Sequence, residues 1–154
     1  MLQKVMSNAV FVGTMVGQIV FGVLGDDLGR KKMFMVTLLF IIPFSGLSAA
    51  AVDINGSGSI YMWLTITRFF CGIGIGGEYP LSALITSELS KRSRRGRNLA
   101  IVFSSQGVGN LMASLVCAVM AYAIPAEWVW RIALLLPSAI CLLIAYPRSQ
   151  LTES

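Results

Sequence analysis

The sequence predicts an all-α membrane protein with five spanning helices. The 154-residue chain is 56% hydrophobic, only 12% charged and has a mean hydropathy of +0.77, whereas soluble domains carry about 25% charged residues. Its apolar runs reach the length of about 20 residues that crosses the hydrocarbon core as a helix. They do not alternate with period two, as the strands of a transmembrane barrel would. The loops between them are short and alternately basic and non-basic, as in multi-pass proteins.

Five apolar stretches are long enough to span as helices. They cover residues 5–24, 33–52, 60–88, 99–123 and 128–146. The third stretch is long enough to tilt or bend within the bilayer. We expect residues 1–154 to form a single membrane domain.

The loops predict the orientation. Residues 25–32 (GDDLGRKK) and 91–97 (KRSRRGR) are basic, whereas residues 53–59 and 125–127 contain neither Lys nor Arg. Positively charged loops stay in the cytoplasm, so both basic loops and the carboxyl terminus are expected there. Nine of the 12 Lys and Arg residues lie in these loops or at Arg148, which explains the net charge of +5 without nucleic acid. The amino terminus is then outside, and we expect a further helix to precede it.

Histidine-based catalysis and histidine-ligated metal sites are excluded within this chain, because it contains no histidine. Its three cysteines lie in apolar stretches without CxxC spacing and are interpreted as packing residues. They are Cys71, Cys117 and Cys141. We expect no cofactor, no metal and no enzymatic activity.

The stretch GIGIGGEYP matches the dinucleotide-binding pattern at Gly72, Gly74 and Gly77. That pattern requires a preceding strand and a helix that opens at its last glycine. Here the glycines lie inside one apolar segment, so a nucleotide site is rejected. Gly72 and Gly76 instead form a GxxxG pair, which lets another membrane helix approach closely. Pro80 lacks an N–H and crowds the carbonyl of Gly76, which predicts a kink.

Glu78 is the charged residue inside this segment, roughly midway between Ile60 and Lys91. A charge at the centre of a bilayer costs about 2.5–3.5 kcal/mol or more. Glu78 should therefore face a polar cavity, pair with a cation or hold a proton. Arg68 is about 15 Å away along the helix axis, too far for a direct pair. Two interpretations stay open: a proton-carrying carboxyl, or a structural carboxyl that is hydrogen-bonded to a neighbouring helix.

Three neutral polar residues are expected at a similar depth: Tyr79, Gln106 and Asn110. Gln106 and Asn110 are four residues apart and share one helix face. Buried amides need hydrogen-bond partners. These groups could join helices together, or they could line a solute site.

Around the first basic loop, the sequence resembles the cytoplasmic signature of the major facilitator superfamily. The matching residues are Gly22, Asp26, Gly29, Arg30 and Lys31. This motif is specific to the superfamily and carries no information about the substrate.

A narrower resemblance lies in RFFCGIGIGGEYPLSALITSE and AIVFSSQGVGNL, which are similar to segments of the phosphate:proton symporter family. It covers nearly the whole chain, as family helices two to six. The resemblance implies twelve helices in two six-helix halves, with the solute bound between the halves. This chain would then be part of the amino-terminal half, without family helix one and without the carboxyl-terminal half.

The resemblance also implies a function, namely proton-coupled uptake of inorganic phosphate by alternating access. Glu78 stands where the family has a proton-coupling Asp, and Tyr79 and Gln106 stand at phosphate-contacting positions. Asn110 is a further candidate for substrate binding. Because Glu replaces Asp, transport of a glycerophosphodiester or a sugar stays an alternative. Another alternative is a truncated, non-transporting protein that regulates a full-length relative.

The family resemblance gives the cytoplasmic charges a second interpretation besides orientation. Glu88, Arg30 and Arg95 are candidates for a network that holds the inner helix ends together. The expected partners are a phosphate-like anion, a proton, the lipid bilayer and the rest of the transporter, but not nucleic acid. The expected location is the plasma membrane.

Overall fold

A computed structural model of the chain describes residues 2–51 and 57–149, and all regular structure in that part is helical. The elements are α1 (Leu2–Leu28), α2 (Arg30–Ala49), α3 (Ser57–Leu89), α4 (Arg95–Ala123) and α5 (Ala126–Ser149). Each contains a stretch that is long enough and apolar enough to cross a membrane. The predicted all-α membrane fold is therefore confirmed, and the chain is an integral membrane protein.

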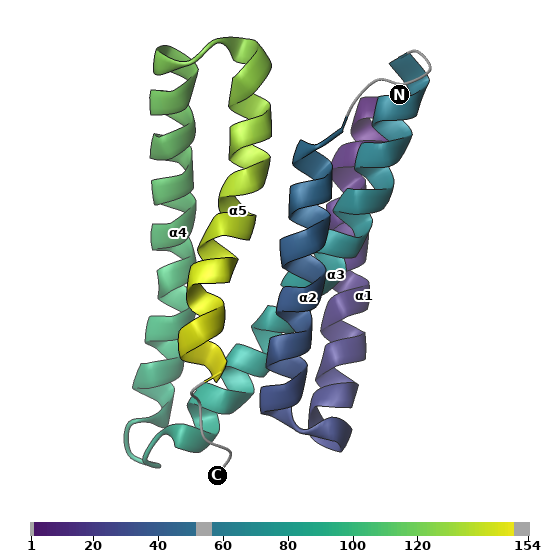
Figure 1. Cartoon of the computed structure of the whole chain (residues 1–154). Coiled ribbons are helices and arrows are strands. Elements are labelled where there is room, and N and C mark those ends of the chain that lie inside the picture. The colour runs from purple at the N-terminus through teal and green to yellow at the C-terminus, as the bar shows by residue number, and fades with distance from the viewer. Residues whose placement is uncertain (1, 52–56, 150–154) are drawn as a thin grey trace.

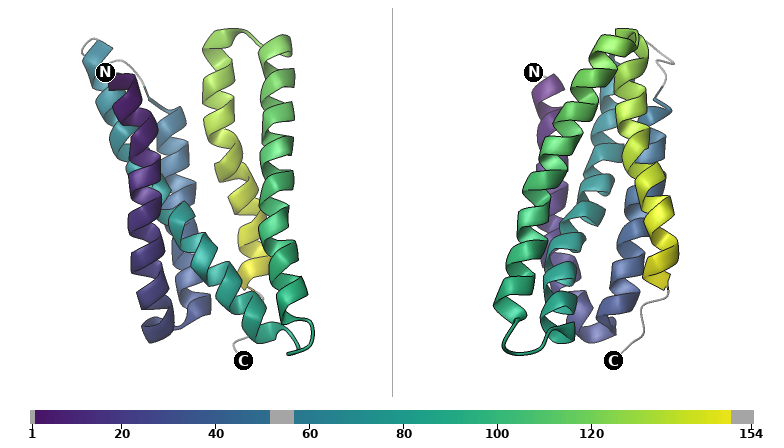
Figure 2. Two further views of the ribbon diagram at one scale, coloured as in Figure 1. Left: turned by 180° about the vertical axis from the view of Figure 1, so that it is seen from behind. Right: turned by 90° about the vertical axis from the view of Figure 1, so that its left-hand side faces the viewer.

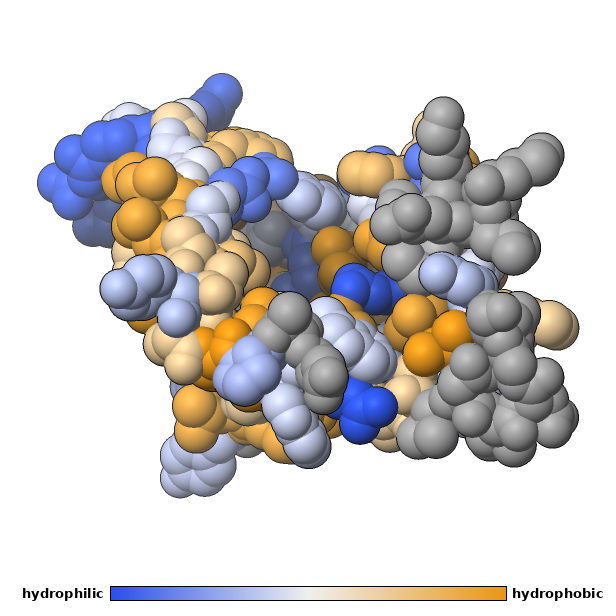
Figure 3. Space-filling model, turned by 90° about the horizontal axis from the view of Figure 1, so that it is seen from above, coloured by the Kyte–Doolittle hydropathy of each residue, from blue (hydrophilic) through white to orange (hydrophobic). Residues whose placement is uncertain are grey.

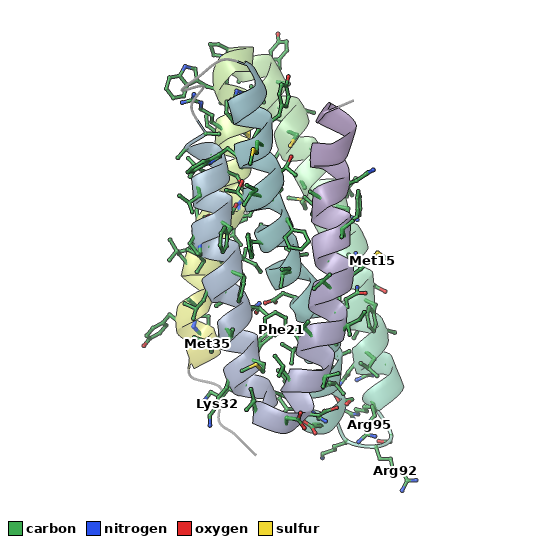
Figure 4. The ribbon with its side chains drawn as sticks, turned by 90° about the vertical axis from the view of Figure 1, so that its right-hand side faces the viewer. Met15, Phe21, Lys32, Met35, Arg92 and Arg95 are labelled. Carbon is green, nitrogen blue, oxygen red and sulfur yellow. The ribbon has the colours of Figure 1, made fainter. Side chains whose placement is uncertain are left out.

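The five helices run alternately up and down in two groups (Figure 1). Helices α1, α2 and α3 pack together, and α4 and α5 form a hairpin beside them, as the views in Figure 2 also show. Both basic turns and the last turn of α5 lie at one end of the bundle, which we call the basic end. Lys32, Arg92 and Arg95 mark that end in Figure 4. Such a one-sided distribution is what the positive-inside rule requires.

Helix α3 meets α1 backbone against backbone, because glycines occupy the contact. A Cβ at Gly72 would overlap the carbonyl oxygen of Val10, and a Cβ at Gly76 would overlap that of Thr14. Two glycines of α1 meet the α3 backbone in the same way: Gly13 and Gly17. Small residues at four-residue spacing permit this approach in membrane helices, and α3 supplies them along the face toward α1.

The hairpin joins the other group largely through α5 and α2. Ser45 of α2 donates to the carbonyl of Leu134 at 2.5 Å, and Ser138 of α5 donates to the carbonyl of Ile42 at 2.7 Å. Both serines are buried, and each hydroxyl reaches a backbone acceptor on the facing helix. Hydroxyls at helix contacts are a common means of association in a membrane.

The outer surface is apolar, as expected for helices that face lipid. Met15 points outward from α1 with 66% of its surface exposed, whereas Phe21 on the same helix lies inside at 3% (Figure 4). Helix α4 is the most exposed of the five, with Met120 its buried residue. The bundle therefore has its core between α1, α2 and α3.

The predicted first basic loop, residues 25–32, is wrong in extent. Helix α1 continues to Leu28 and α2 begins at Arg30, so the turn consists of Gly29 alone. Gly29 has a φ of 94°, a conformation that costs glycine little because it has no Cβ. A charged stretch marks where the chain leaves the hydrocarbon core, but it does not end the helix. Here the helix ends at Gly29, where the backbone conformation changes.

The other helices also extend beyond the predicted spans, except that α4 ends at Ala123 as predicted. Helix α4 begins at Arg95, inside the predicted loop 91–97, and α5 continues to Ser149 through Pro147. Helix α3 is helical from Ser57, before its predicted start. The end of the second predicted span at residue 52 and most of the loop 53–59 lie outside the described residues.

Candidate functional site

Glu78 on α3 is held by a cation and a hydroxyl. The two terminal nitrogens of Arg148 donate to its two carboxylate oxygens, at 2.7 Å to Oε1 and 2.5 Å to Oε2. The Thr37 hydroxyl of α2 also donates to Oε1. The Arg148 and Glu78 side chains are only 14% and 23% exposed. A two-pronged pair of this kind is among the strong hydrogen-bonded arrangements in proteins.

Arg148 is fixed by more than its carboxylate partner. Its Nη1 also donates to the carbonyl of Phe34 at 3.2 Å, and its guanidinium carbon lies 3.8 Å from the centre of the Phe34 ring. A guanidinium over an aromatic face is favourable, more so when shielded from water. Residues from α2, α3 and α5 thus meet around one ion pair.

The ion pair lies nearer the basic end than predicted. Thr37 is seven residues into α2, about 10 Å along a helix about 30 Å long. Arg148 is the second-last residue of α5. The expectation that Glu78 lies roughly midway across the bundle is therefore wrong. Helix α3 runs from Ser57 to Leu89, so Glu78 lies past the midpoint of that helix at Ile73, toward the basic end.

A cavity of about 380 Å³ opens beside the ion pair. Its lining comes from α2, α3, α4 and α5 and consists of Phe34, Ile75, Glu78, Tyr79, Ser82, Val102, Phe103, Ser105, Gln106 and Arg148. Seen from above, down the helix axes, the molecule is hollowed between the α1–α2–α3 group and the α4–α5 hairpin. Hydrophilic residues, in blue, are visible inside the hollow (Figure 3). The cavity combines one acid, one base and several neutral hydrogen-bonding groups, a set suited to a small polar solute.

The structure brings two of the three predicted neutral residues together. The amide nitrogen of Gln106 donates to the Tyr79 hydroxyl at 2.7 Å, which links α4 to α3 across the cavity wall. Asn110 lies exposed one turn further along α4 and is not among the lining residues. Tyr79 and Gln106 thus share the cavity with Glu78, and Asn110 does not.

The predicted packing residues lie on the same helix as the acid. Gly72 and Gly76 face α1, and α3 stays helical through Pro80. Thr37 of α2 approaches Gly74 and Gly77 closely as well. Small residues on α3 therefore let α1 and α2 come close enough for Thr37 to reach Glu78.

At the basic end, Arg30 joins two acids. It donates to Asp26 at 3.0 Å and pairs with Glu88 of α3. The acid side chains are 62% and 51% exposed, so water screens this cluster. Lys31 is half-buried beside it, and a side chain at Gly22 would meet no atom within 4 Å. Among the described residues, Arg95 is exposed and joins neither acid.

Sequence reasoning missed Arg148, Thr37 and Phe34. The sequence pattern gives Arg148 only a role in orientation, as one of the nine charges expected on the cytoplasmic side. One signal could have found it: side chains on a helix lean toward its amino terminus. A long cation in the last turn of a spanning helix therefore reaches back into the bundle.

Comparisons with known proteins identify the family. A probable inorganic phosphate transporter 1-6 from Arabidopsis thaliana is 37% identical over 99% of this chain and 33% of its own length. A low affinity inorganic phosphate transporter 4 from Petunia hybrida is 38% identical over 96% of this chain and 31% of its own length. The chain thus spans about a third of these relatives, and the predicted resemblance to phosphate transporters is confirmed.

Among solved structures, the inward open xylose transporter XylE from E. coli has a TM-score of 0.85 at 21% identity. The match covers 99% of this chain and 38% of XylE, and it supports the fold. A family model of the Major Facilitator Superfamily matches residues 2–150. The chain therefore belongs to the Major Facilitator Superfamily.

Proposed function

We propose that this chain is part of a transporter that moves inorganic phosphate together with a proton by alternating access. The observation that carries the proposal is the cavity where the Glu78–Arg148 pair meets Tyr79 and Gln106. A cation and neutral donors suit an oxyanion, and a carboxylate can carry a proton. The named relatives are phosphate transporters, which supports the same substrate.

Each part of the proposal has its own residues. Glu78 is the proton-coupling acid, and Tyr79 and Gln106 contact the anion. Asn110 does not line the cavity, so a role for it requires α4 to turn or to face another part of the transporter. The five helices act as one membrane domain, and the plasma membrane is the proposed location.

We propose that the exposed cluster at the basic end holds the inner helix ends together in one state of the transport cycle. Arg30 and Glu88 join the ends of α2 and α3, and such a pair contributes about 0–1 kcal/mol. A weak contact that exists in one state and breaks in another biases the equilibrium between them. Arg95 would join this network only in a different arrangement of α4.

The test is phosphate uptake by a chimaera. Residues 2–149 replace the matching segment of the petunia transporter, and uptake of radiolabelled phosphate is driven by a pH gradient. We expect uptake in the chimaera, no uptake with Glu78→Gln, and none from residues 1–154 alone. The unaltered petunia transporter is the positive control.

Competition distinguishes the alternatives. Excess glycerophosphodiester or xylose should leave phosphate uptake by the chimaera unchanged. Inhibition by either solute would reassign the substrate. A chimaera that reaches the membrane but takes up no tested solute would favour a regulatory, non-transporting role. Saturable uptake by residues 1–154 alone would contradict the requirement for the rest of a transporter.

A further inference from the structure

We propose that Arg148 is itself a ligand for the transported anion, blocked by ionised Glu78 and released when Glu78 takes a proton. The proposal rests on the proposed function and adds a residue and an order of events to it. The proton binds first, the guanidinium is freed, and the oxyanion then takes the place of the carboxylate.

The geometry makes the two anions competitors. One N–H of each terminal nitrogen of Arg148 donates to an oxygen of Glu78, so the carboxylate fills the fork between these two nitrogens. A phosphate oxyanion binds the same planar fork of N–H donors in the same two-pronged way. Arg148 lines the cavity together with Tyr79 and Gln106, so an anion held by these neutral groups lies within reach of it.

The charges in the cavity also favour this exchange. With Glu78 ionised, the pair is neutral and offers no net attraction to an anion. A proton on Glu78 leaves one positive charge, and a bound monoanion restores neutrality. The proton without the anion, or the anion without the proton, leaves an unbalanced charge in a largely buried site, which costs several kcal/mol. The empty and the fully loaded sites are therefore the two stable forms.

No other charged residue lines the described part of this cavity. Helix α5 contributes Arg148, and the half-buried Cys141, two turns earlier, lies on the same face of that helix. Helix α3 adds the phenol of Tyr79 to the lining. From α2, the non-ionising hydroxyl of Thr37 donates to Glu78. The residues that line the cavity from α4 are uncharged. The protonation state of Glu78 thus controls the charge that an entering anion meets.

Phosphate binding to the full chain in lipid nanodiscs tests the proposal. Phosphorus NMR follows inorganic phosphate, and a pH indicator in weak buffer follows protons. The wild-type chain should bind more tightly as the pH falls, and it should take up a proton as it binds phosphate. Phosphate titrates as well, but equally for every variant, so comparison with Glu78→Gln isolates the contribution of Glu78.

Glu78→Gln should bind phosphate at least as tightly as the wild type, with no proton uptake from this site. Adding Arg148→Gln to that variant should weaken binding by about tenfold or more, since charge-assisted hydrogen bonds are lost. The double variant leaves no unpaired charge, so its fold is protected. Arg131→Gln in the same background is the matched control, because Arg131 is also on α5 but lies beside Trp128 and Trp130. It should change binding less than about twofold.

The outcomes separate this proposal from the choice of substrate. If neither Glu78→Gln nor the added Arg148→Gln changes the affinity for phosphate, the role of Arg148 is overturned and phosphate stays the substrate. Binding of nitrate, a monovalent oxyanion, in place of phosphate and with the same proton uptake would overturn phosphate and support the role of Arg148. Loss of all oxyanion binding in Glu78→Gln would overturn the proposal, because that variant keeps the cation free.

Discussion

Helix α3 meets α1 through backbone atoms, whereas α5 meets α2 and α3 through polar side chains. At the first contact, glycines such as Gly76 lie directly against carbonyl groups. At the second contact, Ser45 and Ser138 donate to carbonyls, and Arg148 bridges to Glu78. The two contacts hold together one bundle by different means.

The difference bears on which parts can move. Close backbone packing has one good arrangement, since interiors are as dense as organic crystals. A hydroxyl or a guanidinium can exchange one acceptor for another at a smaller cost. The α1–α3 contact is therefore expected to stay rigid, while the α4–α5 hairpin can shift against it. Four substitutions test this contrast.

Arg148→Met should have the largest effect on stability, because it leaves the Glu78 carboxylate largely buried and unpaired. Removing one partner of a buried pair costs about 3–5 kcal/mol, and partial exposure of Glu78 places the loss at the low end. The loss should shrink as the pH falls, since a proton then neutralises Glu78. The free energy of unfolding of the full chain in mixed micelles measures it. Arg131→Met is the control, and an equal loss there would contradict the assignment.

Gly76→Ala should destabilise the α1–α3 contact by about 1–3 kcal/mol, the usual range for overpacking. The added Cβ meets the backbone of Thr14, which cannot rotate away. Gly107→Ala on α4 is the matched control, since no atom lies within 4 Å of its Cβ position. The control should be neutral or slightly stabilising, because alanine favours helix by about 1 kcal/mol. If Gly76→Ala and Gly107→Ala lowered the free energy of unfolding equally, the close α1–α3 backbone contact would not explain the loss.

Ser138→Ala should cost about 0.6 kcal/mol and at most about 1.7, the measured range for hydrogen bonds between membrane helices. Its hydroxyl donates to α2 across the hairpin contact. In Ser114→Ala the lost bond is to the Asn110 carbonyl of its own helix, so a smaller change is expected. Thermal unfolding of both variants checks this, and a larger loss in Ser114→Ala would contradict it.

Glu88→Gln should have the smallest effect, about 0–1 kcal/mol, because the Arg30–Glu88 pair is exposed. Salt should reduce even this effect, since exposed charges are screened. Unfolding at low and high ionic strength measures both quantities. A loss as large as that of Arg148→Met would contradict this, because the cluster at the basic end would then contribute as much to the free energy of unfolding as the buried pair.

The sequence predicts the number and order of the described helices and singles out the acid, but not the helix ends or the depth of the acid. Apolar length fixes where a chain can span a bilayer, and an acid within such a span stands out, as Glu78 did. Contacts between helices depend on tilt and rotation, which hydropathy does not encode. The sequence therefore placed Glu78 too near the middle and left Arg148 outside the site.

The turn at Gly29 illustrates the same limit at the local level. Hydropathy marked the charged residues 25–32 as a loop, but a helix ends only where its backbone conformation changes. The glycine spacing on α3 was informative because close packing requires a missing Cβ. It could not say which helix would lie there, and the structure places α1 against Gly72 and Gly76.

The pairing of one acid with one base at the cavity has an electrical consequence. A membrane potential does work of about 2.3 kcal/mol per elementary charge for each 100 mV. The neutral Glu78–Arg148 pair experiences almost none of it, and neither does a site that holds one proton and one monoanion. A carrier with this site alone would respond to the pH gradient and not to voltage. An ionophore that sets the potential would show whether another charged group makes transport electrogenic.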